Sequence, residues 1–301
     1  MTSEVALHAR ATVIHEAAPA KLNLDLHLRG RRDDGYHLLD SIVSFTELGD
    51  VLTFEPAASW SLVIDGPFAS ALEAAGENLV AGAADRLAHL AGIQPRARVR
   101  LTKNLPIASG IGGGSADAAA ALRGLCRLWR LQLNTDQLSD LALALGADVL
   151  CCLESSPQRL QGIGERLSPV QTPAAAILLL NPGVAVATAD VFRAADLPAG
   201  SAFGPAEIWR NPTIDGETGL PLWLLDGRND LTEPATRLCP EVGDAIASLE
   251  KTGAVISRMS GSGATCFGLF ASDEACHAAE RLLRNSRPDW WCQATRLAPV
   301  L

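Results

Sequence analysis

The first part of the chain alternates apolar and polar residues in the manner of β-strands. Between residues 12 and 28, one side of the predicted strands carries Leu22, Leu24, Leu26 and Leu28, and the other carries Lys21, Asn23, Asp25 and His27. A polar side this regular is most often in contact with solvent. The pattern further predicts a hairpin of residues 41–48 and 51–55 across Gly49-Asp50, a strand at 60–64 and another at 97–103.

Helical spacing dominates the next stretch. Asn78 and Gly92 are residue types that begin and end helices, so the apolar stripe between them predicts a helix over 78–90. We expect further helices at 115–131, 135–145, 188–194, 240–251 and 273–285, one opened by Asn229-Asp230, and strands at 176–181, 254–259, 264–270 and 290–297. Residues 201–222 are rich in turn residues and predict an irregular surface segment. This order of strands and helices is typical of an α+β protein, with a domain boundary near residue 165.

A glycine-rich stretch, residues 103–122, lies between a predicted strand and a predicted helix. Ser115 is a suitable N-cap for that helix, and Asp117 adds negative charge to its first turn. The loop before it contains Gly110, Gly112, Gly113 and Gly114, whose amides can converge on an anion at the helix N-terminus. We interpret it as a phosphate-binding loop, the alternative being a flexible connector. The loop has neither the lysine of a Walker A motif nor the glycine spacing of a Rossmann fold.

A second loop of small residues spans 260–265, between two predicted strands. By itself it indicates an ordinary hairpin turn. Together with the first loop it raises the hypothesis that two glycine loops, one on each domain, close over one phosphorylated ligand from opposite sides.

Length, charge and cysteine usage limit the protein class. A chain of 301 residues is long enough for two domains, and its net charge of −9 argues against nucleic acid or an acidic membrane as a partner. Seven scattered cysteines without a Cys-x-x-Cys pair indicate a reduced, cytoplasmic protein and no cysteine metal site. The first residues lack the apolar core of a secretory signal, and the apolar segment 141–153 is too short to cross a bilayer. We therefore expect a cytoplasmic protein with small-molecule partners, either a monomer or a homodimer.

Three separated motifs agree with one family. The sequences PAKLN at 19–23, LPIASGIGGGS at 105–115 and SGSG at 260–263 resemble the three motifs of the GHMP small-molecule kinases. Five shorter motifs are similar to the branch that phosphorylates 4-diphosphocytidyl-2-C-methyl-D-erythritol in the non-mevalonate isoprenoid pathway: GYH at 35–37, GADV at 146–149, GIGE at 162–165, NPGV at 181–184 and NDL at 229–231. The resemblance extends from about residue 18 to residue 270.

This resemblance implies a fold and a reaction. The fold would be an α+β, two-domain GHMP kinase architecture, with an N-terminal ribosomal-protein-S5-like, ATP-binding domain at residues 1–165 and a C-terminal ferredoxin-like α/β sandwich domain at 166–301. The reaction would be transfer of the ATP γ-phosphate, with Mg²⁺, to the 2-hydroxyl of the substrate. Asp148 would take or orient the hydroxyl proton, and Lys21 would keep Asp148 ionised and offset charge on the moving phosphoryl group.

The remaining roles follow the family motifs residue by residue. ATP would be bound by Pro106, Ala108, Ser109, Gly110, Ile111, Gly112, Gly113, Gly114, Ser115 and Ala116, with Ser115 also a candidate Mg²⁺ ligand. The cytidylyl substrate would be bound by Asn23, Tyr36, His37, Thr188, Phe192, Gly261, Ser262 and Gly263. The aromatic rings would enclose the base, since an aromatic face with polar contacts at the edge suits a pyrimidine.

One departure and two alternatives accompany this interpretation. Where the family commonly has proline and two aromatic residues after GADV, this chain has Leu150-Cys151-Cys152. This changes the shape of the wall behind Asp148, and we expect neighbouring side chains to repack. A kinase for homoserine or mevalonate would share the loops but not Tyr36, His37 and Phe192, and a nucleotide-binding module without turnover would have no need of both Lys21 and Asp148.

Overall fold

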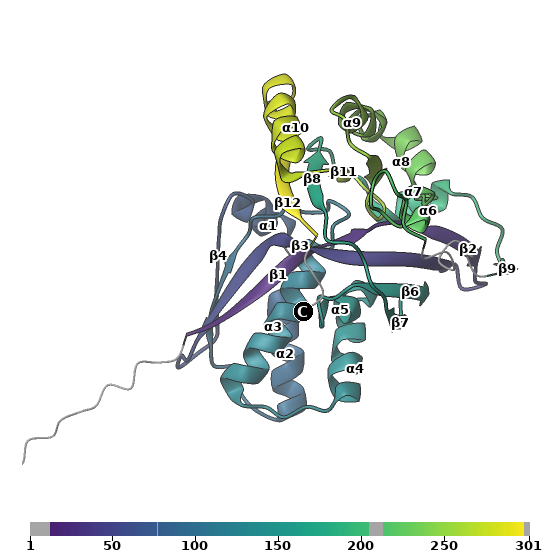
Figure 1. Cartoon of the computed structure of the whole chain (residues 1–301). Coiled ribbons are helices and arrows are strands. Elements are labelled where there is room, and N and C mark those ends of the chain that lie inside the picture. Colours follow the sequence, from purple (N-terminus) through teal and green to yellow (C-terminus); the bar gives the residue numbers. More distant parts are fainter. Residues whose placement is uncertain (1–12, 77, 205–212, 298–301) are drawn as a thin grey trace, which may run out of the picture.

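The computed structural model describes residues 13–76, 78–204 and 213–297, which form two β-sheets with helices packed on them (Figure 1). Within these residues, the first sheet comprises β1 (Ile14–Asn23), β2 (His27–Arg31), β3 (His37–Glu55), β4 (Ser61–Asp65), β5 (Arg98–Thr102), β6 (Gln158–Gly162), β7 (Arg166–Pro169) and β9 (Ser201–Ala202). The second sheet comprises β8 (Ala176–Asn181), β10 (Ile256–Met259), β11 (Cys266–Phe270) and β12 (Trp291–Arg296). The fold is therefore α+β, as predicted.

The long strand β3 is the axis of the first sheet, and the predicted hairpin at Gly49-Asp50 is wrong. Strand β3 continues through both residues, and its antiparallel pairing with β1 places Gly49 opposite Pro19 and Asp50 opposite Ala18. A side chain at position 49 would collide with the backbone of β1. Glycine is thus present because the two strands pass closely, and not because the chain turns.

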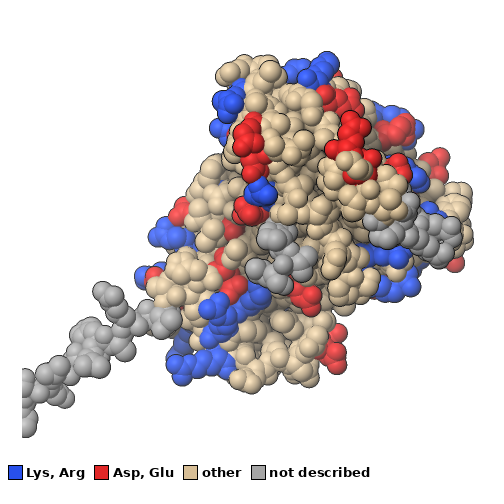
Figure 2. Space-filling view, viewed as in Figure 1, with Lys and Arg blue, Asp and Glu red and all other residues tan. Residues whose placement is uncertain are grey.

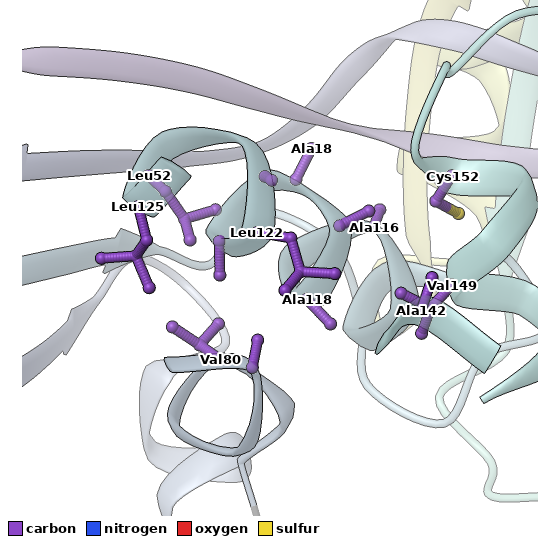
Figure 3. Close-up of a cluster of buried hydrophobic side chains, with 14 of the residues drawn as sticks. Ala18, Leu52, Val80, Ala116, Ala118, Leu122, Leu125, Ala142, Val149 and Cys152 are labelled. Atoms are coloured by element: carbon purple, nitrogen blue, oxygen red, sulfur yellow. The ribbon is translucent and has the colours of Figure 1, made fainter. Parts of the chain in front are cut away.

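The helices of this part are α1 (Ala69–Ala75), which contacts β4, and α2 (Leu79–Ala91), α3 (Gly113–Trp129), α4 (Thr135–Leu145) and α5 (Ala147–Cys152). Helix α3 packs on β1 and β3, and α2, α4 and α5 pack around α3. The alanine-rich face of α3 packs between the sheet and α2, where Leu122 and Leu125 lie among Leu52 and Val80 (Figure 3). Small side chains let α3 approach the sheet closely, which fixes the position of its N-terminus.

Strand β8 is buried on both faces, as its uninterrupted apolar run predicts. On one side Leu178 and Leu180 pack with α9 (Pro240–Lys251) and α10 (Asp273–Ser286), and on the other Ile177 and Leu179 pack with residues of β1 such as Ala20 and Leu22. The two sheets therefore share a hydrophobic core. The helices α6 (Thr188–Ala194), α7 (Leu222–Leu225) and α8 (Thr232–Leu238) complete the second part.

Most predicted helix and strand limits agree with the structure to within two residues, and α6 and α9 agree at both ends. The helix predicted to open at Asn229-Asp230 begins instead at Thr232. Of the predicted irregular segment 201–222, residues 205–212 lie outside the described part, while β9 at its start pairs with β2 of the first sheet. Strand β7 also belongs to the first sheet, and the domain division at residues 165/166 remains a prediction.

Candidate active site

A cavity of about 610 Å³ lies between the two parts of the molecule and is lined by residues of both. Most residues predicted to form a site line it: Lys21, Asn23, Pro106, Ala108, Ser109, Gly110, Gly112, Gly113, Gly114, Ser115, Asp148, Thr188, Phe192, Gly261 and Ser262. Five do not. Ile111 and Ala116 are buried in hydrophobic clusters, and Tyr36, His37 and Gly263 are outside the lining. Folding thus gathers motifs that are more than a hundred residues apart in sequence.

Lys21 and Asp148 form an ion pair at one side of the cavity. Lys21 Nζ donates a hydrogen bond of 2.8 Å to Asp148 Oδ1. Burial by itself lowers the pKa of Lys21. The Asp148 carboxylate raises this pKa by more than burial lowers it, so the net pKa lies above its ordinary value. The Lys21 side chain is 5% exposed and that of Asp148 47%. The pair therefore presents a carboxylate to the cavity, held by a lysine that stays protonated.

The polar residues at the end of β1 and the start of β2 are buried, so the expectation of a solvated surface is wrong. Lys21, Asn23, Asp25 and His27 are each at most 4% exposed. Lys21 is covered by Asp148 and the glycine loop, and Asn23 by the second part of the molecule. Asn23 donates its backbone N–H to Ser260 Oγ at 3.1 Å, and the Arg258 guanidinium donates to Leu24 O at 2.7 Å. The regular polar pattern here marks residues that face other segments of the same molecule, and not solvent.

The glycine loop ends in the helix α3, but not where the sequence predicted. The helix begins at Gly113, its N-cap is Gly112 in the left-handed conformation, and Ser115 makes no capping hydrogen bond. Ser115 is therefore inside the first turn, and Asp117 lies beyond that turn with its side chain buried. Residues 113–115 line the cavity, and because they begin the helix their backbone N–H groups have no acceptor within it, which suits an anion.

The two glycine loops touch each other directly, so they do not close from opposite sides. Ser260 Oγ donates to Gly110 O at 3.0 Å, and the Thr265 N–H donates to Ser109 O at 3.0 Å. A Cβ atom at Gly110 would lie 2.6 Å from both Ser260 O and Gly263 O. Asn229 holds the second loop through hydrogen bonds to the carbonyls on both sides of Ser260. The loops form one continuous wall of the cavity.

A buried ion cluster of Asp50, Lys103 and Asp117 lies behind the glycine loop, and the sequence reasoning missed it. Lys103 Nζ contacts Asp50 Oδ2 and lies 2.7 Å from Asp117 Oδ2, and all three side chains are at most 3% exposed. The signal was present in the strand pattern, because Lys103 follows Val99 and Leu101 at a spacing of two, on the side facing the core.

Several residues predicted for substrate, among them Thr188, Phe192 and Ser262, line the cavity. The His37 and Phe192 rings lie 5.1 Å apart, and the Thr188 and Ser262 hydroxyls are hydrogen-bonded at 2.8 Å. Burial lowers the pKa of His37, and the nearby Arg31 guanidinium lowers it further, which favours a neutral ring. Tyr36 is 61% exposed on the adjacent turn. The structure brings His37 against Phe192, which lines the cavity, while His37 and Tyr36 are themselves outside the lining.

Comparison with known proteins agrees with this geometry. Models described as the GHMP kinases N terminal domain and the GHMP kinases C terminal match residues 78–156 and 222–286. The chain is 48% identical over 282 residues to the 4-diphosphocytidyl-2-C-methyl-D-erythritol kinase of Paramagnetospirillum magneticum, covering 93% of this chain and 97% of the relative. The chain belongs to the GHMP kinase family. The kinase of the same name from Ruegeria pomeroyi is also 48% identical, over 94% of this chain and 99% of that one.

Solved GHMP kinases share the whole architecture. A crystal structure of 4-(cytidine 5'-diphospho)-2C-methyl-D-erythritol kinase matches with a TM-score of 0.76 at 33% identity, covering 95% of this chain and 99% of that one. Homoserine kinase from Cytophaga hutchinsonii matches with a TM-score of 0.67 at 19% identity, covering 98% and 97% of the two chains. At that identity the second match supports the fold only. The two-domain GHMP kinase fold predicted from the sequence is confirmed.

In this GHMP kinase the wall behind Asp148 is made of thiols. Cys151 and Cys152 are fully buried on α5, and Cys151 Sγ donates to Asp148 O at 3.4 Å. The pKa of Cys152 is raised well above its ordinary value by its hydrogen bond with Cys151 and by burial, so the thiol stays neutral. Within the described residues no group of three or more His, Cys, Asp or Glu side chains could hold a metal ion. The cysteines serve as small apolar side chains.

The surface charges and the helix lengths describe the outside of the molecule. On the face seen in Figure 2, basic and acidic side chains are interspersed, without a broad basic surface for nucleic acid. Of the helices in the described part of the chain, none is long and apolar enough to cross a membrane.

Proposed function

We propose that this GHMP kinase transfers the γ-phosphate of ATP to the 2-hydroxyl of 4-diphosphocytidyl-2-C-methyl-D-erythritol, giving the 2-phosphate and ADP. The product belongs to the non-mevalonate route to isoprenoid precursors, and we assign the enzyme to the cytoplasm. The observation that carries the proposal is the Lys21–Asp148 ion pair beside a wall of unpaired helix N–H groups in one cavity. The name shared by relatives 48% identical over nearly the whole chain supports the choice of substrate.

The phosphates of ATP would lie against the glycine loop. The N–H groups at the start of α3 and the positive end of its dipole provide a fixed site for negative charge. Gly112 allows Lys21 to approach, since a Cβ atom at position 112 would be 3.1 Å from Lys21 Cβ. Lys21 also donates its backbone N–H to Ile111 O at 2.9 Å, which ties the catalytic strand to the loop. The loop and the ammonium group are therefore positioned as one unit.

Asp148 would act on the hydroxyl of the acceptor. Its carboxylate is half-exposed toward the cavity, while its partner Lys21 is buried and protonated. The carboxylate would accept or orient the hydroxyl proton, and the Lys21 ammonium would offset negative charge on the transferred phosphoryl group. Phosphoryl transfer depends on such alignment and charge neutralisation more than on covalent chemistry.

Mg²⁺ would enter with the nucleotide. The described residues provide no cage of acidic side chains, and Mg²⁺ commonly binds through phosphates, water and only one or two protein oxygens. The Ser115 hydroxyl lines the cavity in the first turn of α3 and is our candidate ligand. When bound, Mg²⁺ would neutralise charge on the phosphates.

The cytidylyl part would bind where Phe192 lines the cavity, with the His37 ring packed beside it. Their rings lie in contact, and the hydrogen-bonded hydroxyls of Thr188 and Ser262 are close by on the cavity wall. This combination of an aromatic face and polar edge contacts suits a pyrimidine base. Asn23, Gly261 and Gly263 would shape the acceptor end, and Tyr36 would reach the base from its exposed turn.

A comparison of alcohols tests the proposal. Purified enzyme is given MgATP with 4-diphosphocytidyl-2-C-methyl-D-erythritol, homoserine or mevalonate separately, and ADP release and the mass of the phosphorylated product are measured. We expect turnover with the cytidylyl alcohol alone. Turnover with homoserine or mevalonate alone would assign the enzyme to another branch of the family, and binding of MgADP without turnover of any alcohol would refute the kinase mechanism.

A further inference from the structure

The guanidinium of Arg123 joins the two elements that carry the ion pair of the site. Arg123 lies on α3, which contacts both β1 and α5. Its Nη1 donates to Cys152 O at 2.9 Å and to Leu153 O at 3.1 Å, at the end of α5. Its Nη2 donates to Ala17 O on β1 at 2.8 Å, and its Nε donates to Glu16 Oε2 at 3.1 Å. One side chain therefore connects the helix of the glycine loop, the strand of the lysine and the helix of the aspartate.

A guanidinium suits this position for two reasons. It presents five N–H donors in fixed directions, and the last carbonyls of a helix have no N–H partner within the helix. Its positive charge also interacts favourably with the negative end of the α5 dipole. The Arg123 side chain is 25% exposed and its carboxylate partner Glu16 is 11% exposed. The group is thus held by the protein while one part of it stays within reach of solvent.

The location of Asp148 depends on how α5 is held. Among the described residues, the hydrogen bond of the Asp148 carboxylate is the one with Lys21, and the side chain is 47% exposed. Helix α5 has six residues, and its N-cap, Gly146, provides no side-chain hydrogen bond. A helix this short is not stable by itself. The contacts that hold the backbone of α5 therefore decide where the carboxylate lies.

Two further side chains donate to carbonyls of α5, and they connect it to other places. The Ser155 hydroxyl donates to Cys152 O at 2.9 Å, and the Gln158 amide donates to Cys151 O at 3.3 Å. Ser155 is only three residues from its acceptor, so its hydrogen bond does not fix α5 relative to β1. Gln158 is the first residue of β6 and connects α5 to that strand. Arg123 is the side chain that ties the end of α5 to β1.

We propose that Arg123 is a positioning residue for phosphoryl transfer, which holds α5 against β1 so that Asp148 stays aligned with Lys21 and the glycine loop. This inference rests on the roles that the proposed function gives to Asp148 and Lys21. Without the guanidinium, the carbonyls of β1 and of the end of α5 lose this common donor, and α5 can shift relative to β1. A shift of about 1 Å at a reacting centre costs on the order of 100-fold in rate.

Two substitutions at this position test the inference. Arg123→Met keeps most of the side-chain length and removes every N–H donor. Arg123→Lys keeps the charge next to Glu16, but its compact ammonium does not reproduce the planar fork that reaches β1 and α5 together. We expect kcat to fall about 10- to 100-fold in Arg123→Met and by a smaller factor in Arg123→Lys. KM for MgATP and the Kd of MgADP should stay within about twofold of the wild type, because the glycine loop keeps its own contacts.

Arg127→Met is the matched control. Arg127 lies one turn further along α3 and donates to the other oxygen of Glu16, and within the described residues no hydrogen bond joins it to α5. The substitution removes the same kind of side chain and the same carboxylate contact. It should keep the wild-type kcat.

A double-mutant cycle separates positioning from a general effect on stability. If Arg123 acts through Asp148, Arg123→Met should cause little further loss of kcat in the Asp148→Asn background, because the group to be positioned is absent. Guanidinium chloride at a non-denaturing concentration should restore part of the kcat of Arg123→Ala and none of that of Asp148→Asn. A residue that only stabilises the fold would show neither result.

Hydrogen exchange tests the same inference without turnover. Amides of residues 147–153 should exchange faster in Arg123→Met than in the wild type and in Arg127→Met, because the end of α5 has lost donors that hold it. Should Arg123→Met fail to fold, as judged by circular dichroism, Arg123→Lys provides the same comparisons.

Three results would overturn the inference: wild-type kcat in Arg123→Met, an equal loss of kcat in Arg127→Met, or a loss in the double variant that is the full product of the two single losses. If the wild type phosphorylates none of the alcohols offered, the proposed function fails, and unchanged exchange of residues 147–153 in Arg123→Met then refutes the inference as well. If the wild type is active and Arg123→Met is equally active, only the inference fails.

Discussion

The contact between the two glycine loops makes Gly110→Ala an informative substitution. Gly110 has φ +76°, and a Cβ atom there would be 2.6 Å from two carbonyl oxygens of the second loop, Ser260 O and Gly263 O. Both obstacles are backbone atoms, so no side-chain rotation relieves them. The loops must move apart before an alanine fits.

The size of the effect follows from this geometry. Ordinary van der Waals contact begins at 3.4 Å, so the loops have to separate by nearly 1 Å. A displacement of this size at a reacting centre costs on the order of 100-fold in rate. The left-handed conformation adds about 1–2 kcal/mol for a residue with a side chain. We therefore expect kcat to fall about 100-fold and the free energy of unfolding to fall by a few kcal/mol.

Gly253→Ala is the matched control. Gly253 has φ +84°, and nothing lies within 4 Å of a Cβ atom at this position. It should lose the same conformational free energy, about 1–2 kcal/mol, and keep wild-type kcat. The assays are steady-state ADP release and urea unfolding of both variants. Wild-type kcat in Gly110→Ala, or an equal loss of kcat in Gly253→Ala, would refute the view that direct loop contact positions the site.

Further predictions concern single side chains of the site. Asp148→Asn should lower kcat by at least ~100-fold while MgADP still binds in calorimetry, because the group that handles the hydroxyl proton is removed; full activity would contradict this role. Since Asp148 more than compensates the lowering of the Lys21 pKa by burial, Lys21 stays charged, and the stability that its ion pair contributes is lost only above its ordinary pKa of 10.5. A pH profile of kcat at saturating substrates should therefore show no fall in kcat from deprotonation of Lys21 between about pH 8 and 10. A fall in kcat over this range that is absent in Asp148→Asn would contradict the claim that Lys21 stays charged. Phe192→Ala should raise KM for the cytidylyl alcohol about tenfold or more and leave KM for MgATP unchanged, as expected when stacking on a base is removed. Cys152 should remain unlabelled by iodoacetamide in the folded enzyme and react after unfolding, as mass spectrometry can measure, because the thiol is buried and neutral.

Local patterns predicted most elements because each depends on a few neighbouring residues. The cap at Asn78, the uninterrupted apolar run of β8 and the turn at Gly162 are such cases. The same local rules failed at Gly49-Asp50, which has the composition of a turn but lies within β3. The pairing of β3 with β1 overrides turn propensity there, and pairing between distant strands cannot be read from six adjacent residues.

The sequence by itself determined the chemistry available to the site. It contains a glycine loop before a helix and three motifs that resemble those of the GHMP kinases, and this resemblance predicted the family. Cap residues and alternation gave the elements that carry these groups, because those signals act over one or two turns of chain.

Only the tertiary structure decided which polar residues are buried together. The polar residues 21–27 looked solvated until the glycine loop, Asp148 and the second part of the molecule covered them, and Lys103 looked unremarkable until the structure placed Asp50 and Asp117 beside it. It also decided that the glycine loops touch directly. Burial and the pairing of charges depend on segments far apart in sequence, and they set the pKa values and distances on which the chemistry depends.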